Sequence, residues 1–243
     1  MKDLEQENKE LKEALEFKSD LISMTAHQLR TSMSATKWVL KMLLDGDLGP
    51  LTEEQKIFIK KTEDNNEKMI TFVSEMIDIN KEESREIRYT FGKYNLKELV
   101  CNTVGEFRGE AAKKNVSLKC HCEEFSKPVE VDREKIQTVI QGLVENAIKY
   151  NKEGGSVTLS SKEDGDFVII SVEDTGIGIA EKEKEKIFDK FFRTDSAKKH
   201  ESIGSGLGLF VIQRIVERHN GEIWFDSKEG IGTTFNVKIP FNQ

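Results

Sequence analysis

Long hydrophobic runs and an excess of positive charge are both missing from this sequence, and each absence excludes a class of protein. The 243 residues include 37 Lys and Arg against 44 Asp and Glu, a formal net charge of −7, which disfavours a nucleic-acid-binding surface. The apolar runs are short, as at residues 167–170 (FVII), well below the ~18 residues of a membrane span. We therefore expect no nucleic-acid partner and no membrane contact within this chain.

A secretion signal is also missing, because the first ten residues, MKDLEQENKE, are polar and acidic. Cysteine is scarce, with only Cys101, Cys120 and Cys122. An odd number of cysteines without a secretory context favours a reducing compartment. We expect a cytoplasmic protein, or the cytosolic part of a longer, membrane-tethered receptor.

The triplet Cys120-His121-Cys122 raises the question of a zinc site. Along a strand, alternation sends His121 to the face opposite both cysteines, and no second pair of ligands appears in the sequence. We therefore interpret the triplet as ordinary strand residues in preference to a metal site.

Helical spacing marks residues 1 to about 45, where a heptad seam with polar interruptions steps by alternating fours and threes. The seam residues are Leu4, Asn8, Leu11, Leu15, Lys18, Ile22, Thr25 and Leu29. The run DGDLGP at 45–50 ends the pattern, and Thr52 and Gln55 then have the spacing of a capping box. A second helix is predicted to about residue 83, with a core of Phe58, Met69, Phe72, Val73, Met76 and Ile77.

One hairpin of two long helices is too thin to bury both of its faces. Two such hairpins form a four-helix bundle, so we expect a homodimer through residues 1–84. After residue 84, short β-rich runs alternate with helices, which predicts an α/β sandwich over residues 85–243. The predicted fold class is thus α+β, a dimeric helical bundle followed by an α/β sandwich.

Within the second part, strands are expected at 86–91, 116–122, 129–131, 156–161, 167–173, 222–227 and 233–239. Helices are expected at 96–113, 133–150, 181–190 and 207–219. The polar segment 193–205 has few apolar residues and is expected to be a loop.

Three short motifs in this part carry possible chemistry. Asn146 and Lys149 are three apart and share a helix face; an amide oxygen suits Mg²⁺ and an ammonium suits phosphate, although two solvated helix residues would look the same. Asp174 ends a β run and can accept a hydrogen bond from an exocyclic amine. Gly176 and Gly178 after it let the backbone approach a flat ligand, or form a tight turn.

The third motif, Gly204-Ser205-Gly206-Leu207-Gly208, opens the helix at 207–219. Free N–H groups at a helix start form a cradle for an anion. The motif matches only half of a dinucleotide fingerprint, because it follows a polar loop and no further glycine completes the spacing. No Gly-Lys-Ser/Thr follows, so it is not a Walker motif.

In this order and at these separations, the motifs resemble the catalytic core of a bacterial sensor histidine kinase, and the resemblance spans nearly the whole chain. It implies a dimerisation and phosphoacceptor domain at 1–84 and an ATP-binding domain of the GHKL superfamily at 85–243. It also implies ATP and Mg²⁺ as cofactors, and the receiver domain of a response regulator as partner.

The resemblance assigns a role to each matching residue. Asn146 would bind Mg²⁺, Lys149 and Tyr150 would contact phosphate and base or ribose, and Asp174 would hold the adenine amino group. Arg193 ends the phenylalanine-rich box 187–193 and would reach the γ-phosphate. Gly176 and Gly178 would lie beside the adenine ring. The residues that would close on the phosphates are Gly204, Gly206, Leu207 and Gly208.

His27, in the run TAHQLRT at 25–31, matches the family's phosphoacceptor. A neutral imidazole offers Nε2 to phosphorus while Nδ1 keeps its proton. The resemblance implies autophosphorylation of His27, then transfer to an aspartate of the regulator. Thr31, one turn on, would orient the water that dephosphorylates the regulator.

The sequence departs from the family pattern at three positions. Gln28 replaces the usual Glu and cannot accept the Nδ1 proton, and Ser32 replaces a Pro that would bend the helix. These two changes leave open a catalytically weakened relative that acts mainly as a phosphatase or scaffold. Gly142 stands where ATP-hydrolysing relatives have a Glu that activates water, which disfavours an ATPase of the gyrase or chaperone type.

Overall fold

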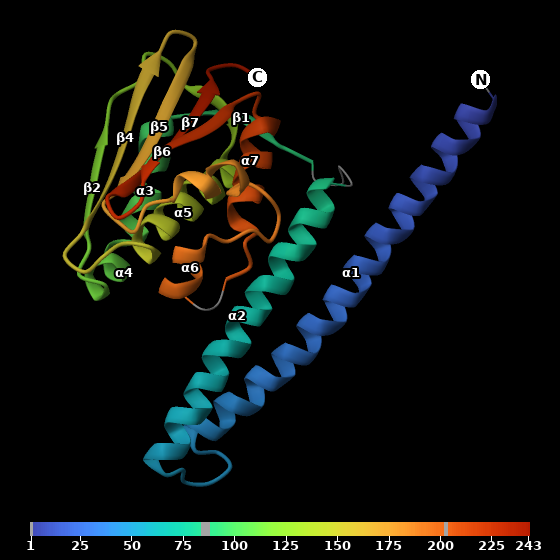
Figure 1. Cartoon of the computed structure of the whole chain (residues 1–243), viewed down its shortest axis with the longest axis vertical. Coiled ribbons are helices and arrows are strands. Elements are labelled where there is room, and N and C mark those ends of the chain that lie inside the picture. The colour runs from blue at the N-terminus through green and yellow to red at the C-terminus, as the bar shows by residue number, and fades with distance from the viewer. Residues whose placement is uncertain (1, 84–87, 202–203) are drawn as a thin grey trace. The chain divides into compact units, whose positions relative to one another are not determined.

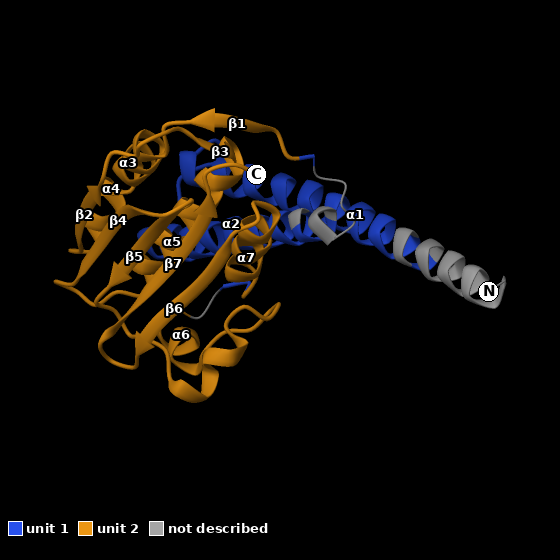
Figure 2. Cartoon of the chain, turned by 90° about the horizontal axis from the view of Figure 1, so that it is seen from above, with its two compact units in different colours: residues 1–88, 203–205 blue, residues 89–202, 206–243 orange. Residues whose placement is uncertain are grey.

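The computed structural model describes residues 2–83, 88–201 and 204–243 (Figure 1). The side chains of residues 2–13, 15, 16, 78 and 81–83 lie outside the described part. The chain forms two compact units, residues 1–88 with 203–205, and residues 89–202 with 206–243 (Figure 2). In the described part of the chain, no helix is both long and apolar enough to cross a bilayer.

The first unit is a hairpin of helix α1 (Lys2–Asp45) and helix α2 (Glu53–Glu83). The predicted capping box is confirmed: the Thr52 N–H donates to Gln55 Oε1 at 2.9 Å, and the Gln55 N–H donates to Thr52 Oγ1 at 3.2 Å. These two bonds satisfy backbone donors that a helix start leaves without partners, so the position at which α2 begins follows from local sequence.

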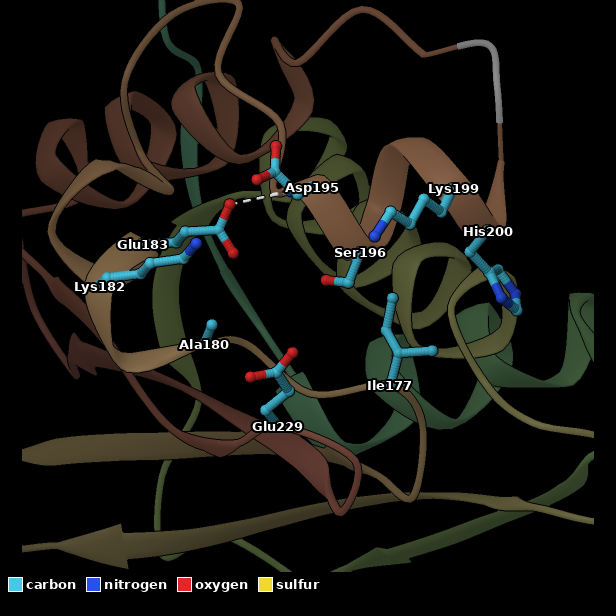
Figure 3. A pocket seen from close by; sticks show the side chains of 9 residues that line it. All are labelled: Ile177, Ala180, Lys182, Glu183, Asp195, Ser196, Lys199, His200 and Glu229. Carbon is cyan, nitrogen blue, oxygen red and sulfur yellow. Dashed lines mark hydrogen bonds between the residues drawn. The ribbon is translucent and has the colours of Figure 1, made fainter.

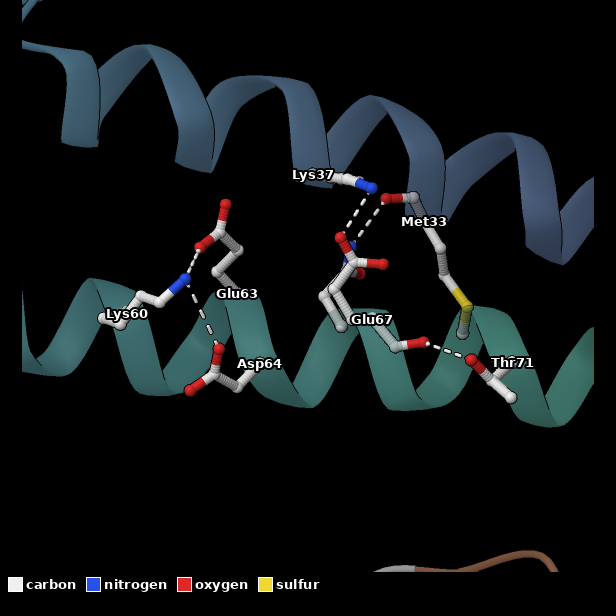
Figure 4. Close-up of polar contacts among 8 residues, drawn as sticks. Met33, Lys37, Lys60, Glu63, Asp64, Glu67 and Thr71 are labelled. Carbon is white, nitrogen blue, oxygen red and sulfur yellow. Dashed lines mark hydrogen bonds and ion pairs between the residues drawn. The ribbon is translucent and has the colours of Figure 1, made fainter. Parts of the chain in front are cut away.

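A stripe on α1 packs against α2, and its positions again step by fours and threes: Ser19, Ser23, Ala26, Arg30, Met33, Lys37 and Leu40. Polar contacts accompany the apolar ones. The buried Asn80 amide donates to the Ser19 carbonyl at 2.9 Å, and Lys37 forms an ion pair with Glu67 at 2.5 Å (Figure 4). The heptad on this stripe is therefore largely polar.

This stripe lies one residue away from the predicted seam. Lys18, Thr25 and Leu29 of the predicted seam are exposed, and the side chains of its first four residues lie outside the described part. On α2, Val73 and Ile77 of the predicted core are buried within the hairpin, whereas Phe58 and Met69 are 62% and 46% exposed in the single chain. Small residues such as Ala26 permit close helix contact, so the larger apolar side chains remain outside.

The second unit contains a five-stranded sheet in the order β2 (Ser117–Cys122), β4 (Ser156–Asp164), β5 (Phe167–Asp174), β7 (Gly232–Pro240) and β6 (Glu222–Lys228). Strands β2 and β4 are parallel, and the other pairs are antiparallel. A separate antiparallel pair joins β1 (Phe91–Tyr94) to β3 (Val129–Asp132).

Helices α3 (Leu96–Glu106), α5 (Arg133–Lys149) and α7 (Gly208–Arg218) cover one face of the sheet (Figure 1). Alternate residues of β5, such as Val168, Ile170 and Val172, are buried against this layer, as strand geometry requires. The α/β sandwich predicted from the sequence is confirmed, and its core lies between the helices and the sheet.

Several elements differ from the prediction. The expected strand at 86–91 is wrong for the described residues 88–90, since β1 begins at Phe91. The expected helix at 96–113 is interrupted at Phe107, after which α4 (Arg108–Lys113) begins. The segment from 181 is a short 3₁₀ helix, η1 (Glu181–Lys186). The expected loop at 193–205 contains helix α6 (Asp195–His200), whose N-cap Thr194 accepts from the Ala197 N–H at 3.1 Å.

Candidate functional site

Two of the three predicted motifs meet in the second unit. Tyr150 caps the C-terminus of α5, and its carbonyl accepts a 3.0 Å hydrogen bond from the Ile177 N–H, in the loop that follows β5. Buried Asn151 supports this junction: its amide donates to the Ala147 and Ser156 carbonyls. The Asn146–Tyr150 segment and the Asp174–Gly178 segment are therefore fixed beside one another.

Asp174 is the end residue of β5, and its carboxylate is only half used by the protein. Oδ1 accepts from the Gly176 N–H at 2.7 Å and from the Thr233 N–H at 3.3 Å, whereas Oδ2 makes no hydrogen bond with the described residues. Burial raises the pKa of Asp174 to about 6, against the opposing effect of those two backbone donors. A partly buried carboxylate with one unpaired oxygen fits a ligand that carries N–H donors, such as an exocyclic amine.

The glycines after Asp174 are required by close backbone contacts. A Cβ at Gly176 would collide with the Tyr150 carbonyl, and one at Gly178 would collide with the Lys228 carbonyl. Gly178 also has φ +62°, which disfavours other residues. Sequence reasoning interpreted these glycines as room for a ligand; the structure shows that they also hold the loop against α5 and the β6–β7 turn.

On α5, Asn146 and Lys149 are half-buried and have polar groups to spare. The Asn146 amide makes no hydrogen bond with the described residues. The Lys149 ammonium forms no ion pair with them and lies 5.4 Å from the centre of the Tyr150 ring. An amide oxygen and an unpaired ammonium match what Mg²⁺ and phosphate require, so the donor set fits the nucleotide and the metal that the sequence predicts.

Gly142, one turn before Asn146, is explained by packing. A Cβ there would lie 2.9 Å from Ile212 Cδ1 on α7, closer than normal contact. The missing side chain leaves room for the end of the Ile212 side chain against α5. The position also offers no carboxylate to activate water.

The third glycine motif lies between α6 and α7, directly before the start of α7. Gly206 has φ +70°, and a Cβ there would lie 2.7 Å from the Phe191 carbonyl carbon. Leu207 is buried and Gly208 begins α7, so the first N–H groups of that helix are free of intrahelical partners.

Arg193 is held by the backbone of α6. Its guanidinium donates to the Ala197 carbonyl at 3.2 Å and to the Glu201 carbonyl. Contact with a phosphate would require Arg193 to leave these carbonyls. Its predicted role toward the γ-phosphate remains a prediction.

A cavity of about 610 Å³ lies between the loop after β5, η1 and α6 (Figure 3). Its lining residues are Ile177, Ala180, Lys182, Glu183, Asp195, Ser196, Lys199, His200 and Glu229. The carboxylate of buried Glu183 accepts a 2.9 Å hydrogen bond from the Asp195 N–H, which connects η1 to α6. None of the predicted site residues lines this cavity, although Ile177 lies between two of them.

His200, a residue outside the predicted site, joins α6 to the α5 motif. Its Nε2 lies 3.1 Å from the Lys149 carbonyl oxygen, and its ring centre lies 6.2 Å from that of Tyr150. The separation of 51 residues between His200 and Lys149 gives no local signal of this contact.

In the first unit, His27 and Gln28 are exposed on α1 beside buried Ala26. The Thr31 hydroxyl is also exposed and donates to the His27 carbonyl at 3.0 Å. Helix α1 continues without interruption through Ser32, whose carbonyl accepts from the Thr36 hydroxyl. The imidazole is thus open to solvent and not enclosed between the two helices.

Comparison with known protein families matches both parts of the chain. Residues 17–85 match the His Kinase A (phospho-acceptor) domain, and residues 131–243 match the histidine kinase-, DNA gyrase B- and HSP90-like ATPase domain. Sensor histidine kinase WalK of Bacillus subtilis is 31% identical over 231 residues, 92% of this chain and 37% of WalK. Adaptive-response sensory kinase SasA of a Synechococcus strain is 31% identical, over 98% of this chain and 63% of SasA.

Solved structures of histidine kinases are also similar to this chain. The catalytic domain of histidine kinase ThkA is 33% identical, with a TM-score of 0.56 over 63% of this chain and 99% of that domain. ThkA in complex with the response regulator TrrA is 27% identical, with a TM-score of 0.67 over 97% of this chain and 65% of that one. Full-length ShkA with AMPPNP, at 22% identity, shares the fold, with a TM-score of 0.75 over 91% of this chain and 46% of ShkA. The chain belongs to the histidine kinase family, with a phosphoacceptor-type helical region followed by an ATPase-type α/β domain.

Proposed function

We propose that the chain binds ATP in its second unit, transfers the γ-phosphoryl group to His27, and passes it on to an aspartate of a response-regulator receiver domain. One observation carries the proposal: the Ile177 N–H bond to the Tyr150 carbonyl brings the α5 motif and the Asp174 motif together. The AMPPNP bound by ShkA and the regulator bound by ThkA support the two partners.

In the nucleotide site, Asp174 Oδ2 accepts a hydrogen bond from the adenine amino group. Gly176 and Gly178 permit close approach of the adenine ring. The Lys149 ammonium attracts phosphate, and Tyr150 contacts the base or ribose. The Asn146 carbonyl oxygen would hold Mg²⁺, which would supply positive charge to the phosphates; a loose phosphoryl-transfer transition state depends mainly on such charge neutralisation.

The closing segment contributes backbone donors. The N–H groups of Gly206, Leu207 and Gly208 form the anion-binding start of α7, with Gly204 preceding them. The Arg193 guanidinium gives up its hydrogen bonds to the Ala197 and Glu201 carbonyls and binds the γ-phosphate instead. Helix α6 rests on the end of α5 through His200, so movement of α6 and exposure of Lys149 are linked.

On α1, the His27 Nε2 lone pair attacks the γ-phosphorus of ATP, the bond to the β,γ-bridging oxygen breaks and ADP leaves, while Nδ1 keeps its proton. Gln28 fixes the tautomer by accepting a hydrogen bond from Nδ1–H but does not remove the proton. Thr31 orients the water that dephosphorylates the regulator, which would give the protein phosphatase activity as well.

The helical domain, residues 1–84, would form a homodimer ahead of the catalytic domain at 85–243. Large apolar side chains of α1 are exposed in the single chain, among them Phe17, Leu21, Met24 and Trp38, which is 64% exposed. They recur at heptad spacing, so a second hairpin laid along them would form a four-helix bundle.

The test is incubation of the full chain with γ-labelled ATP and Mg²⁺. We expect an acid-labile, base-stable label that disappears in His27→Ala and persists in His121→Ala, a matched loss of an exposed histidine. Label that survives in His27→Ala would refute the assignment, and free phosphate released at an unchanged rate by that variant would indicate an ATPase.

A second candidate follows from Gln28, which supplies no base beside His27. In this version the protein binds nucleotide but acts mainly as a phosphatase or scaffold for the regulator. It predicts nucleotide binding without label, together with loss of phosphate from a phosphorylated receiver domain that depends on Thr31.

A further inference from the structure

Three thiols converge between α3 and the edge strand β2. Cys101 comes from α3, and Cys120 and Cys122 come from one face of β2. The Sγ atoms of Cys101 and Cys120 are 3.4 Å apart, those of Cys120 and Cys122 are 3.5 Å apart, and all three lie within 4.8 Å of one another. None of these residues belongs to the proposed nucleotide site.

We propose that this cysteine cluster is a three-coordinate site for a soft metal ion, Cu(I). An ion bonded at about 2.3 Å to each of three sulfurs holds them about 3.8–4.0 Å apart. Two of the sulfur separations, 3.4 and 3.5 Å, lie slightly below this range, and the third is at most 4.8 Å, so binding requires only small side-chain movements. All three cysteines are partly exposed and form no disulfide, which leaves the ion a path to them.

The donor set favours Cu(I) over Zn(II). Zinc in structural sites takes four ligands, but among the described residues no histidine or carboxylate joins the three thiols. His121 lies between the two strand cysteines in sequence and so on the opposite face of β2. Three sulfurs without a nitrogen or oxygen partner suit a soft ion of low charge.

A second observation comes from Ser161 on β4, the cross-strand neighbour of Cys122. Its hydroxyl is buried and has no hydrogen-bond partner among the described residues. Paired residues of adjacent strands point to the same face, so this hydroxyl faces the cysteine side. A thiolate at Cys122 would supply the acceptor that the hydroxyl lacks.

Metal binding through cysteine requires thiolates, so an ion that binds this cluster displaces the thiol protons.

The experiment is a titration of the full, reduced chain with Cu(I) against a competing Cu(I) chelator. We expect one ion per chain and protection of all three thiols from alkylation. Cys101→Ser, Cys120→Ser and Cys122→Ser should each weaken binding by roughly 100-fold or more, because loss of an outer partner of a metal ligand alone costs about 10–100-fold.

His121→Ala is the matched control and should bind Cu(I) as the parent does. Nucleotide binding by each variant checks that the second unit has folded, and X-ray absorption on the unmodified chain should find only sulfur around copper. Affinity that survives in Cys101→Ser, nitrogen neighbours to copper, or Zn(II) bound more tightly through the same cysteines would overturn the proposal.

Discussion

Asp174 is a residue whose ionised form lowers the stability of the fold. Its pKa of about 6 lies above the ordinary value of 3.8 because its side chain is partly removed from solvent. The folded state therefore binds the proton more tightly than the unfolded state does. Its contribution to stability is complete below pH 3.8 and is lost as the pH rises through 6.

We predict that Asp174→Asn stabilises the nucleotide-free chain above pH 6 by about 1–3 kcal/mol, because the amide is neutral and its oxygen can still accept from Gly176 and Thr233. The gain should shrink as the pH falls toward 4. Urea unfolding at pH 5 and pH 8 measures it, and an equal gain at both pH values would contradict the burial argument. Adenine nucleotide affinity should fall in the same variant.

Gln28 is the second residue whose chemistry can be isolated. Gln28→Glu restores a proton acceptor beside His27, and general-base assistance is worth up to ~10²–10⁴-fold. We predict at least a severalfold faster formation of phosphohistidine, measured as label at early times. Ser34→Glu adds the same charge on the same exposed helix and should leave the rate unchanged; a rate in Gln28→Glu equal to that of the parent would refute the role.

At the level of elements, the contact between α5 and α7 includes one position without a side chain. We predict that Gly142→Ala changes the free energy of unfolding of the second unit by less than about 1 kcal/mol, because its Cβ would meet only the terminal methyl of Ile212, and the higher helix propensity of alanine offsets the small rearrangement. Urea unfolding measures the change, and a loss well above 1 kcal/mol would show that the Ile212 side chain cannot move aside. Gly105→Ala in α3, where no atom is near, should be neutral or stabilising.

Elements with local signals were predicted well, and those without were not. Thr52 and Gln55 determine the start of α2 by themselves, and the alternation along β5 identifies its buried face. Helix α6 was missed because it has only six residues and few apolar ones, so its main signal is the Thr194 cap. The α1 stripe was displaced by one residue because the small side chains at the contact carry little hydrophobic signal.

The same division holds for the site. Asp174 and Gly176 stand out in sequence because their residue types match a ligand. The meeting of His200 with Lys149, and of Cys101 with the strand cysteines, depends on contacts between distant segments. Strand alternation predicts that Cys120 and Cys122 share a face, but nothing local indicates that α3 brings a third thiol to them.

At the scale of the whole molecule, the exposed apolar side chains of α1 raise the question of the oligomeric state. We predict that the double change Leu21→Glu and Met24→Glu converts a homodimer to a monomer, because it places charges on the exposed apolar side of α1. Light scattering after size exclusion measures the mass. Lys41→Glu, an equally exposed change on the same helix, should remain dimeric, and a dimer that survives the double change would place the interface elsewhere.

Helix α1 extends for 44 residues without a break, about 66 Å at 1.5 Å per residue, and His27 lies past its midpoint. An unbroken helix has no kink at which rotation about its axis could be absorbed. Rotation of its early turns therefore rotates the His27 imidazole about the same axis by a similar angle. With serine at position 32, where a proline would weaken the helix, rotation is a more natural signal for this helix than bending.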